Sequence, residues 1–157
     1  MSTLDVLNAI QNSAVAHAIS KTDHLVGASL QIVHVIGLIL FLASLVLISL
    51  RLLGWVLNQQ TVPQVAAEAS RLMWTGLTLT AFSGTLMFIV TPKLYYYNWA
   101  FGLKMTLVVF AVIVQAVLFR KVAKRAAPHP TFARASVVLS LSCWFAVAFA
   151  GRMIGFV

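Results

Sequence analysis

Residues 23–54 read "DHLVGASLQIVHVIGLILFLASLVLISLRLLG" and form a long, almost continuous run of apolar residues. A helix that crosses a bilayer needs about 20 predominantly apolar residues, and this run exceeds that length. The whole chain of 157 residues shares its character, because 61% of the residues are hydrophobic and 9% are charged. Soluble domains carry about 25% charged residues. The sequence therefore predicts an integral membrane protein.

Four stretches of the chain are long and apolar enough to cross a membrane. The predicted spans are 24–57, 70–92, 98–122 and 132–156. The connections between them are short, and we interpret Pro63 in the first connection as a helix breaker. Short connections place consecutive helices antiparallel to each other. The predicted fold class is therefore all-α, with a four-transmembrane-helix up-down bundle in a domain at 24–157.

The N-terminal segment at 1–23 is too polar and too short to be a further span. Its apolar residues recur at helical spacing; they are Leu4, Leu7, Ile10, Ala14 and Ala18. This pattern predicts a short amphipathic helix that lies in the membrane interface. A frayed terminus is the alternative.

The basic residues are distributed unequally between the two sides of the predicted bundle. One side carries Arg51, Arg71, Arg120, Lys121, Lys124, Arg125 and Arg134, and the other carries Lys21, Lys93, Lys104 and Arg152. The side richer in basic residues is expected in the cytoplasm. We therefore predict a multi-pass protein of the bacterial inner (plasma) membrane with both termini in the periplasm. Most of the basic residues behind the formal charge of +8 flank the predicted spans. The predicted partner is therefore the bilayer rather than nucleic acid.

The first predicted span contains a histidine well inside the membrane. His34 lies ~15 Å deeper than His24 if the helix is straight. Ionisable groups at that depth are rare and usually face the interior of a bundle. Because of their separation, the two histidines cannot ligate one ion from a straight helix. His34 is either a functional ligand or a structural residue that bonds to a serine or carbonyl of another helix.

Several cationic and thioether side chains are expected at a similar depth, in the outer half of the bundle. They are Lys104, Arg152, Met87, Met105 and Met153. The three acidic residues, Asp5, Asp23 and Glu68, all lie outside the predicted spans. Neither of the two cations is therefore expected to find a carboxylate within the bilayer, which suggests an anionic ligand or a water-filled cleft.

Haem b fits this combination of groups. Its two propionates are anionic, its ring is apolar, and a neutral imidazole can ligate its iron. The predicted cofactor-binding residues are His34, Lys104, Arg152, Met105, Met87 and Met153. The second axial ligand is left open: it is a methionine, His24 or a residue of a second subunit, or it is absent. The predicted function is a redox or electron-transfer role, with a redox partner or quinone, in a homo-oligomer.

Copper is the competing cofactor, because imidazole and thioether groups suit Cu(I). The predicted metal ligands are His34, His24, His17 and Asp23, the last three forming a separate candidate site near the first span. The alternative for that site is a solvated interfacial pair with Asp23 capping the span. The corresponding functions are a copper-handling membrane protein, by transport or periplasmic-side copper binding, and a non-catalytic accessory subunit of a membrane complex.

Three segments carry a resemblance to a known group of proteins. They are "HVIGLILFLASLVLISLRLLG", "TGLTLTAFSGTLMFIVTPKLYYYNWAFGLKM" and "GRMIG". They resemble an uncharacterised family of bacterial four-helix inner-membrane proteins, which is similar to the CopD-like copper-resistance membrane domains. The matching motifs are His34, Arg51 to Gly54, Ser83 with Gly84, and Pro92 to Lys104. The resemblance implies the fold and the membrane location, together with copper handling or a b-type haem.

Overall fold

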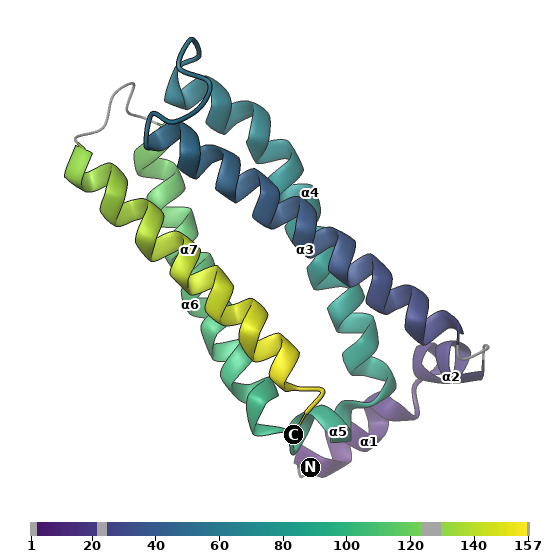
Figure 1. Ribbon diagram of the computed structural model, residues 1–157. Coiled ribbons are helices and arrows are strands. Elements are labelled where there is room, and N and C mark those ends of the chain that lie inside the picture. The colour runs from purple at the N-terminus through teal and green to yellow at the C-terminus, as the bar shows by residue number, and fades with distance from the viewer. Residues whose placement is uncertain (1–2, 22–24, 124–129, 157) are drawn as a thin grey trace.

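The computed structural model describes residues 3–21, 25–123 and 130–156, and it confirms the all-α fold class (Figure 1). The helices in those ranges are α1 (Thr3–Gln11), α2 (Ala14–Lys21), α3 (Leu25–Leu52), α4 (Val62–Val90), α5 (Pro92–Tyr96), α6 (Trp99–Ala123) and α7 (Pro130–Met153). Among them α3, α4, α6 and α7 are long and apolar enough to cross a membrane. The prediction of a multi-pass membrane protein with four spanning helices is confirmed in these terms.

The four long helices form two antiparallel pairs. α3 packs mainly against α4, and α6 packs mainly against α7, whereas contacts between the two pairs are sparse. Figure 1 shows both ends of the described chain at one end of the bundle, with α1 and α5; we call this the termini end. The opposite end, where residues 53–61 join α3 to α4, is called the loop end.

The start of α4 differs from the prediction, because the helix begins at Val62 instead of residue 70. Thr61 caps the helix: its hydroxyl accepts from the Gln64 N–H at 3.4 Å, and its own N–H donates to Gln64 Oε1 at 2.9 Å. Pro63 lies in the first turn, where a proline costs no helical hydrogen bond. The interpretation of Pro63 as a breaker is therefore wrong.

α3 ends earlier than predicted, at Leu52. Gly54 and Leu57 have positive φ angles of 77° and 54°. A right-handed α-helix requires negative φ angles, so α3 cannot continue through these residues. Arg51 then closes the turn, because its Nε donates to the Gln60 carbonyl at 2.7 Å. The Arg51 to Gly54 motif thus has a structural role in the connection to α4.

The predicted N-terminal amphipathic helix is divided into α1 and α2. The break falls at Asn12 and Ser13, and the Ser13 hydroxyl accepts from the Ala16 N–H at 3.3 Å at the start of α2. α1 contacts α4 and α5, and α2 contacts α4. Leu7 and Ala16 are buried in these contacts, while other apolar side chains of both helices remain exposed. Both helices therefore lie against the bundle at its termini end.

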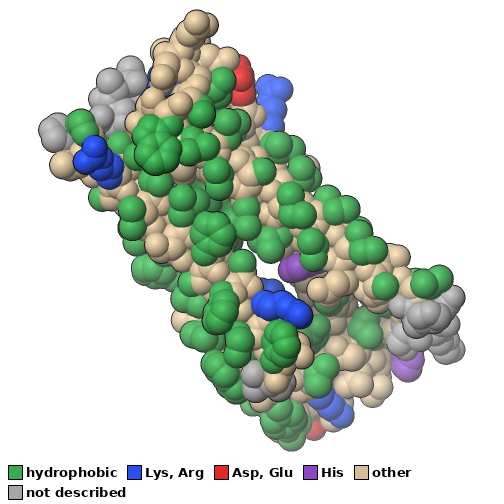
Figure 2. Space-filling model, in the orientation of Figure 1, with side chains coloured by type: hydrophobic (Ala, Val, Ile, Leu, Met, Phe, Trp, Pro, Cys, Tyr) green, Lys and Arg blue, Asp and Glu red, His purple; other side chains and the backbone are tan. Residues whose placement is uncertain are grey.

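The apolar core occupies the middle of the bundle and its loop-end half. It consists of Phe41, Leu45, Ile48, Ala69, Met73, Ala111, Trp144 and Val147. The rings of Phe41 and Trp144 join the two pairs, with centroids 4.3 Å apart. In contrast, no residue of α3 between 25 and 36 is buried. Figure 2 accordingly shows a hollow between the two pairs.

α3 and α4 cross at a pair of glycines. A Cβ atom added to Gly37 would lie 2.6 Å from Thr80 Oγ1 and 2.9 Å from the Gly76 carbonyl oxygen. A Cβ added to Gly76 would lie 2.6 Å from both the Gly37 oxygen and the Phe41 nitrogen. These distances leave no room for a side chain, so the two backbones are in direct contact. The crossing fixes the register between α3 and α4.

This crossing predicts a strong effect of one methyl group. Gly37→Ala should lower the free energy of unfolding by about 1–3 kcal/mol, because the crossing is overpacked. Gly27→Ala, in the same helix with nothing within 4 Å of its added Cβ, is the matched control and should be neutral or slightly stabilising. Thermal unfolding of both variants in detergent measures the difference, and equal melting temperatures would contradict the backbone contact.

Candidate functional site

The His34 side chain is held by one face of α4. His34 Nδ1 lies 3.1 Å from Ser83 Oγ. A Cβ added to Gly84 would lie 3.0 Å from His34 Cε1, so the absent side chain of this glycine makes room for the imidazole. The Thr80 hydroxyl donates to the backbone carbonyl of His34 at 3.4 Å. Thr80, Ser83 and Gly84 together form the seat of His34.

The hydrogen bonds of Ser83 determine which nitrogen of His34 carries the proton. The Ser83 hydroxyl donates to the Leu79 carbonyl at 2.7 Å, and a carbonyl can only accept. The single hydroxyl proton is thereby used, so Ser83 Oγ accepts from His34 Nδ1–H. In the neutral imidazole the other nitrogen, Nε2, then keeps its lone pair. No hydrogen bond to His34 Nε2 is found in the described part of the chain.

Lys104 is the cation of the opposite pair that interacts with His34. Its side chain lies against the α7 backbone: a Cβ added to Gly151 would be 3.3 Å from both Lys104 Cε and Nζ. Lys104 is near enough to His34 for its charge to act on the imidazole. Figure 2 shows a histidine and basic side chains close to one another beside the hollow. Within the described ranges, Lys104 has no hydrogen bond and no ion pair.

The position of Lys104 depends on how α6 and α7 meet at the termini end. Asn98 Nδ2 donates to the Ile154 carbonyl at 3.1 Å, and Asn98 Oδ1 accepts from the Phe101 N–H at 3.2 Å. Asn98 thus caps α6 and fastens it to the end of α7. Phe101 stacks on Phe88 of α4 with centroids 5.5 Å apart, and burial in the same aromatic group raises the pKa of the Tyr95 phenol.

The acidic residues leave Lys104 without a carboxylate. Glu68 was predicted outside the spans, but it lies within α4 because that helix starts at Val62. It is exposed and belongs to the loop-end part of α4, whereas Lys104 lies toward the termini end. Asp5 belongs to α1, and Asp23 lies outside the described residues. The prediction that Glu68 lies outside the spans was therefore wrong. Glu68 is nevertheless too far along α4 to act as a counterion for Lys104.

The other predicted cofactor-binding residues are only partly brought together. Arg152 is exposed, and its guanidinium lies 4.6 Å from the centroid of the Phe156 ring. Met87 is half-buried and lies one helical turn beyond Ser83, on the same face of α4. Met153 is half-buried at the end of α7, and Met105 is 45% exposed. The site that the structure forms thus centres on His34 and Lys104.

The second candidate metal site cannot be placed. His17 is exposed on α2, whereas Asp23 and His24 lie outside the described residues. Among the residues that the structure does describe, no three His, Cys, Asp or Glu side chains form a group that could hold a metal ion. Among the described histidines, His34 is the one with a hydrogen-bonded partner on another spanning helix.

Sequence reasoning missed three polar contributors within the spans. Thr80 donates a hydrogen bond to the backbone carbonyl of His34. Thr80 could have been predicted to face α3, because it lies four residues after Gly76 and therefore on the same helix face. Gln115 and Ser140 bond to each other between α6 and α7 at 2.6 Å. Gln115 stands alone in an otherwise apolar run, and that isolation was the available signal.

The fold and the site define a multi-pass helical membrane protein with an oriented histidine between its two helix pairs. The profile of one protein family, the Family of unknown function (DUF6644), matches residues 9–157. Since the match covers nearly the whole chain, the protein belongs to this family. No curated protein and no solved structure matches the chain. The resemblance to CopD-like domains is not tested by these comparisons and stays a prediction.

The seat of His34 predicts its tautomer. In protein labelled with ¹⁵N-histidine, the His34 signal should be that of a neutral ring protonated at Nδ1. Ser83→Ala removes the acceptor and should shift the ring toward the form protonated at Nε2, because a buried N–H without a partner is unfavourable. His34→Gln assigns the signal, and exposed His17 is the internal control. A wild-type ring protonated at Nε2 would refute the assignment.

Proposed function

We propose that this protein binds a b-type haem through His34 Nε2 and serves as a redox or electron-transfer component of the membrane. The observation that carries the proposal is the hydrogen bond between Ser83 and His34 Nδ1, because a Ser83 hydroxyl that donates to the Leu79 carbonyl favours a proton on Nδ1 and a lone pair on Nε2. Histidine ligands of metals almost always donate their other ring N–H to a neighbouring acceptor. His34 has this arrangement within a membrane-spanning helix.

The residues around His34 fit a haem in three respects. Gly84 leaves space at the imidazole that any side chain would fill. The hollow between the helix pairs lies beside a helix segment, 25–36, whose apolar side chains are not used in the protein core. Lys104 supplies a positive charge without a carboxylate partner among the described residues. When bound, haem would supply a one-electron carrier, and His34 would hold its iron.

The charge of Lys104 indicates where the haem propionates would lie. A half-buried ammonium in a membrane is costly unless an anion accompanies it. The propionates of haem are such anions, and Lys104 would hold one of them on the termini side of His34. Arg152 is exposed on the same side, so its guanidinium would meet a propionate that reaches the surface of the bundle.

The placement of the methionines favours haem over copper. A Cu(I) site would need several thioether or imidazole groups that converge on one point. Met105 is 45% exposed at the surface of α6. A copper-handling role is therefore the weaker proposal, and a non-catalytic accessory subunit is the function that would remain if neither cofactor binds.

The charge distribution supports a membrane location and topology for the protein, and the single histidine of the site supports a homo-oligomer. The excess of basic residues at the loop end supports a bacterial inner-membrane location with both termini in the periplasm. A second copy of the chain in a homo-oligomer could supply the other axial ligand of the haem. A quinone or a redox protein is the proposed electron-transfer partner.

The haem proposal predicts a graded response in matched variants. His34→Gln should abolish the Soret band, while His17→Gln, at an exposed histidine, should leave it unchanged. Ser83→Ala should weaken haem retention about 10- to 100-fold, because it removes the acceptor that orients the ligand. Lys104→Met should also lower retention, whereas Lys93→Met, at an exposed lysine, should not.

Haem and copper content per protein, measured in the same preparations, separates the two cofactors. For haem, the substitutions at His34, Ser83 and Lys104 are the damaging ones. For Cu(I), Lys104→Met should leave binding equal or tighter, because the lysine repels the ion, and Met87→Leu, Met105→Leu and Met153→Leu should be damaging instead. If no variant changes either content, the protein is better explained as an accessory subunit.

The proposed orientation predicts which connections are accessible from outside an intact cell. In a Cys143→Ser background, a cysteine at Asn58 should react only with a membrane-permeant reagent. A cysteine at Tyr97 should also react with an impermeant one, since Tyr97 is 71% exposed at the termini end. The reversed labelling pattern would place the termini in the cytoplasm.

A further inference from the structure

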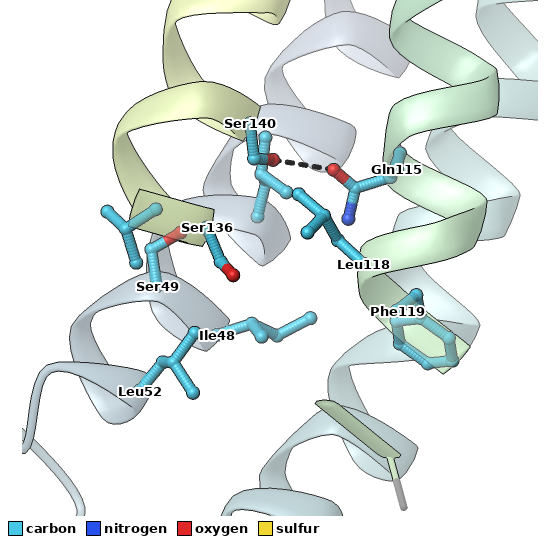
Figure 3. A pocket seen from close by; sticks show the side chains of 10 residues that line it. Ile48, Ser49, Leu52, Gln115, Leu118, Phe119, Ser136 and Ser140 are labelled. Carbon is cyan, nitrogen blue, oxygen red and sulfur yellow. Dashed lines mark hydrogen bonds between the residues drawn. The ribbon is translucent and has the colours of Figure 1, made fainter. Parts of the chain in front are cut away.

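A small polar cavity lies in the loop-end half of the bundle, away from His34 (Figure 3). Its volume is about 30 Å³, and its polar lining consists of Ser49 of α3, Gln115 of α6, and Ser136 and Ser140 of α7. The rest of the lining is apolar. These polar residues are 5–7% exposed, so they are largely buried. Polar groups at such a place need hydrogen-bond partners.

The serines of the cavity behave differently from other hydroxyl residues in the spans. Ser44, Ser83, Thr75 and Thr85 each donate to the carbonyl four residues earlier in their own helix, at 2.7–2.8 Å. The side chains of Ser49 and Ser136 make no hydrogen bond within the described part of the chain, although both are in helices. Figure 3 shows the Ser136 hydroxyl pointing into the cavity. The Ser136 hydroxyl is therefore directed at the cavity, and neither of these two hydroxyls is bonded to the backbone of the described residues.

Gln115 adds a donor to the same space. Its Oε1 accepts from the Ser140 hydroxyl at 2.6 Å, which orients the amide. The amide nitrogen then points into the cavity (Figure 3), and within the described residues it has no acceptor. The cavity thus has a directed N–H donor from α6 and hydroxyl groups from α3 and α7.

We propose that this cavity is a hydration site that holds an ordered water molecule. A water needs about 10–15 Å³ of space and 2–4 polar partners, and the cavity offers both. The water would accept from the Gln115 amide and donate to Ser136 and Ser49. It would link α3 to the α6–α7 pair by hydrogen bonds, at a level where the two pairs otherwise meet through apolar side chains.

The stability of two serine variants distinguishes a hydrated cavity from a dry one. Ser136→Ala removes a partner of the water, so the variant should melt at a lower temperature than wild type. In a dry cavity the same change removes an unsatisfied buried hydroxyl and should leave the melting temperature equal or higher. Ser142→Ala, at an exposed serine of the same helix, corrects for the different helix propensities of serine and alanine.

Direct detection of the water completes the test in full-length protein in detergent. A rotating-frame NMR experiment should show a dipolar contact between water and the Gln115 side-chain amide, and this contact should be weakened in Ser136→Ala. Absence of the contact in wild type, or a Ser136→Ala variant that melts no lower than Ser142→Ala, overturns the proposal. Stability that depends on exchanging sodium for potassium also overturns it, because the occupant would then be a cation.

Discussion

The contact between Gly37 and Gly76 is the constraint on which the rest of the structure depends. Because both positions lack a side chain, the α3 and α4 backbones touch, and any added Cβ would meet backbone atoms at 2.6–2.9 Å. In an antiparallel pair, one fixed contact determines all the others along the two helices. His34 lies about one turn before Gly37, and Ser83 and Gly84 lie about two turns beyond Gly76. The crossing therefore places the imidazole in its seat.

The same constraint bears on why helices pack closely within the α3–α4 pair and leave a hollow between the two pairs. Packing between lipid-embedded helices depends on close van der Waals contact rather than on exclusion of water. α3 and α4 achieve such contact with each other, while the rings of Phe41 and Trp144 provide an aromatic contact between the pairs. Toward the termini end α3 diverges from α7 (Figure 1), whereas α4 stays in contact with α6 through the stacked rings of Phe88 and Phe101. His34 and Lys104 lie in this half of the bundle.

Most of the fold could be predicted from the sequence, because length and hydropathy alone determine where helices cross a membrane. The errors occurred at helix ends, where single side chains decide. Thr61 and Gln64 cap α4 eight residues before its predicted start, at a point where Pro63 is compatible with the first turn. The predicted interfacial helix is divided by the Ser13 cap into α1 and α2.

The candidate site was predictable only in part. Depth alone identified His34, and the absence of acidic residues from its surroundings identified Lys104. The sequence could not show that Ser83 would use its proton on Leu79, since this depends on the rotamer of one hydroxyl. That bond is compatible with both interpretations of His34: one nitrogen makes a structural bond to α4, and under our proposal the other would hold the haem iron. The cavity serines were missed because a single serine in a spanning helix is unremarkable by itself, whereas Gln115 was missed although its isolation in an apolar run was a signal.

The visible absorption spectrum and haem content of the wild-type protein, isolated from cells that make ample haem, test the central claim most directly. The account predicts a Soret band and one b-type haem per chain, released under denaturing conditions because the haem is not covalently attached. A correctly folded, colourless protein that takes up no haem from solution would contradict it, and would leave His34 with its structural bond alone.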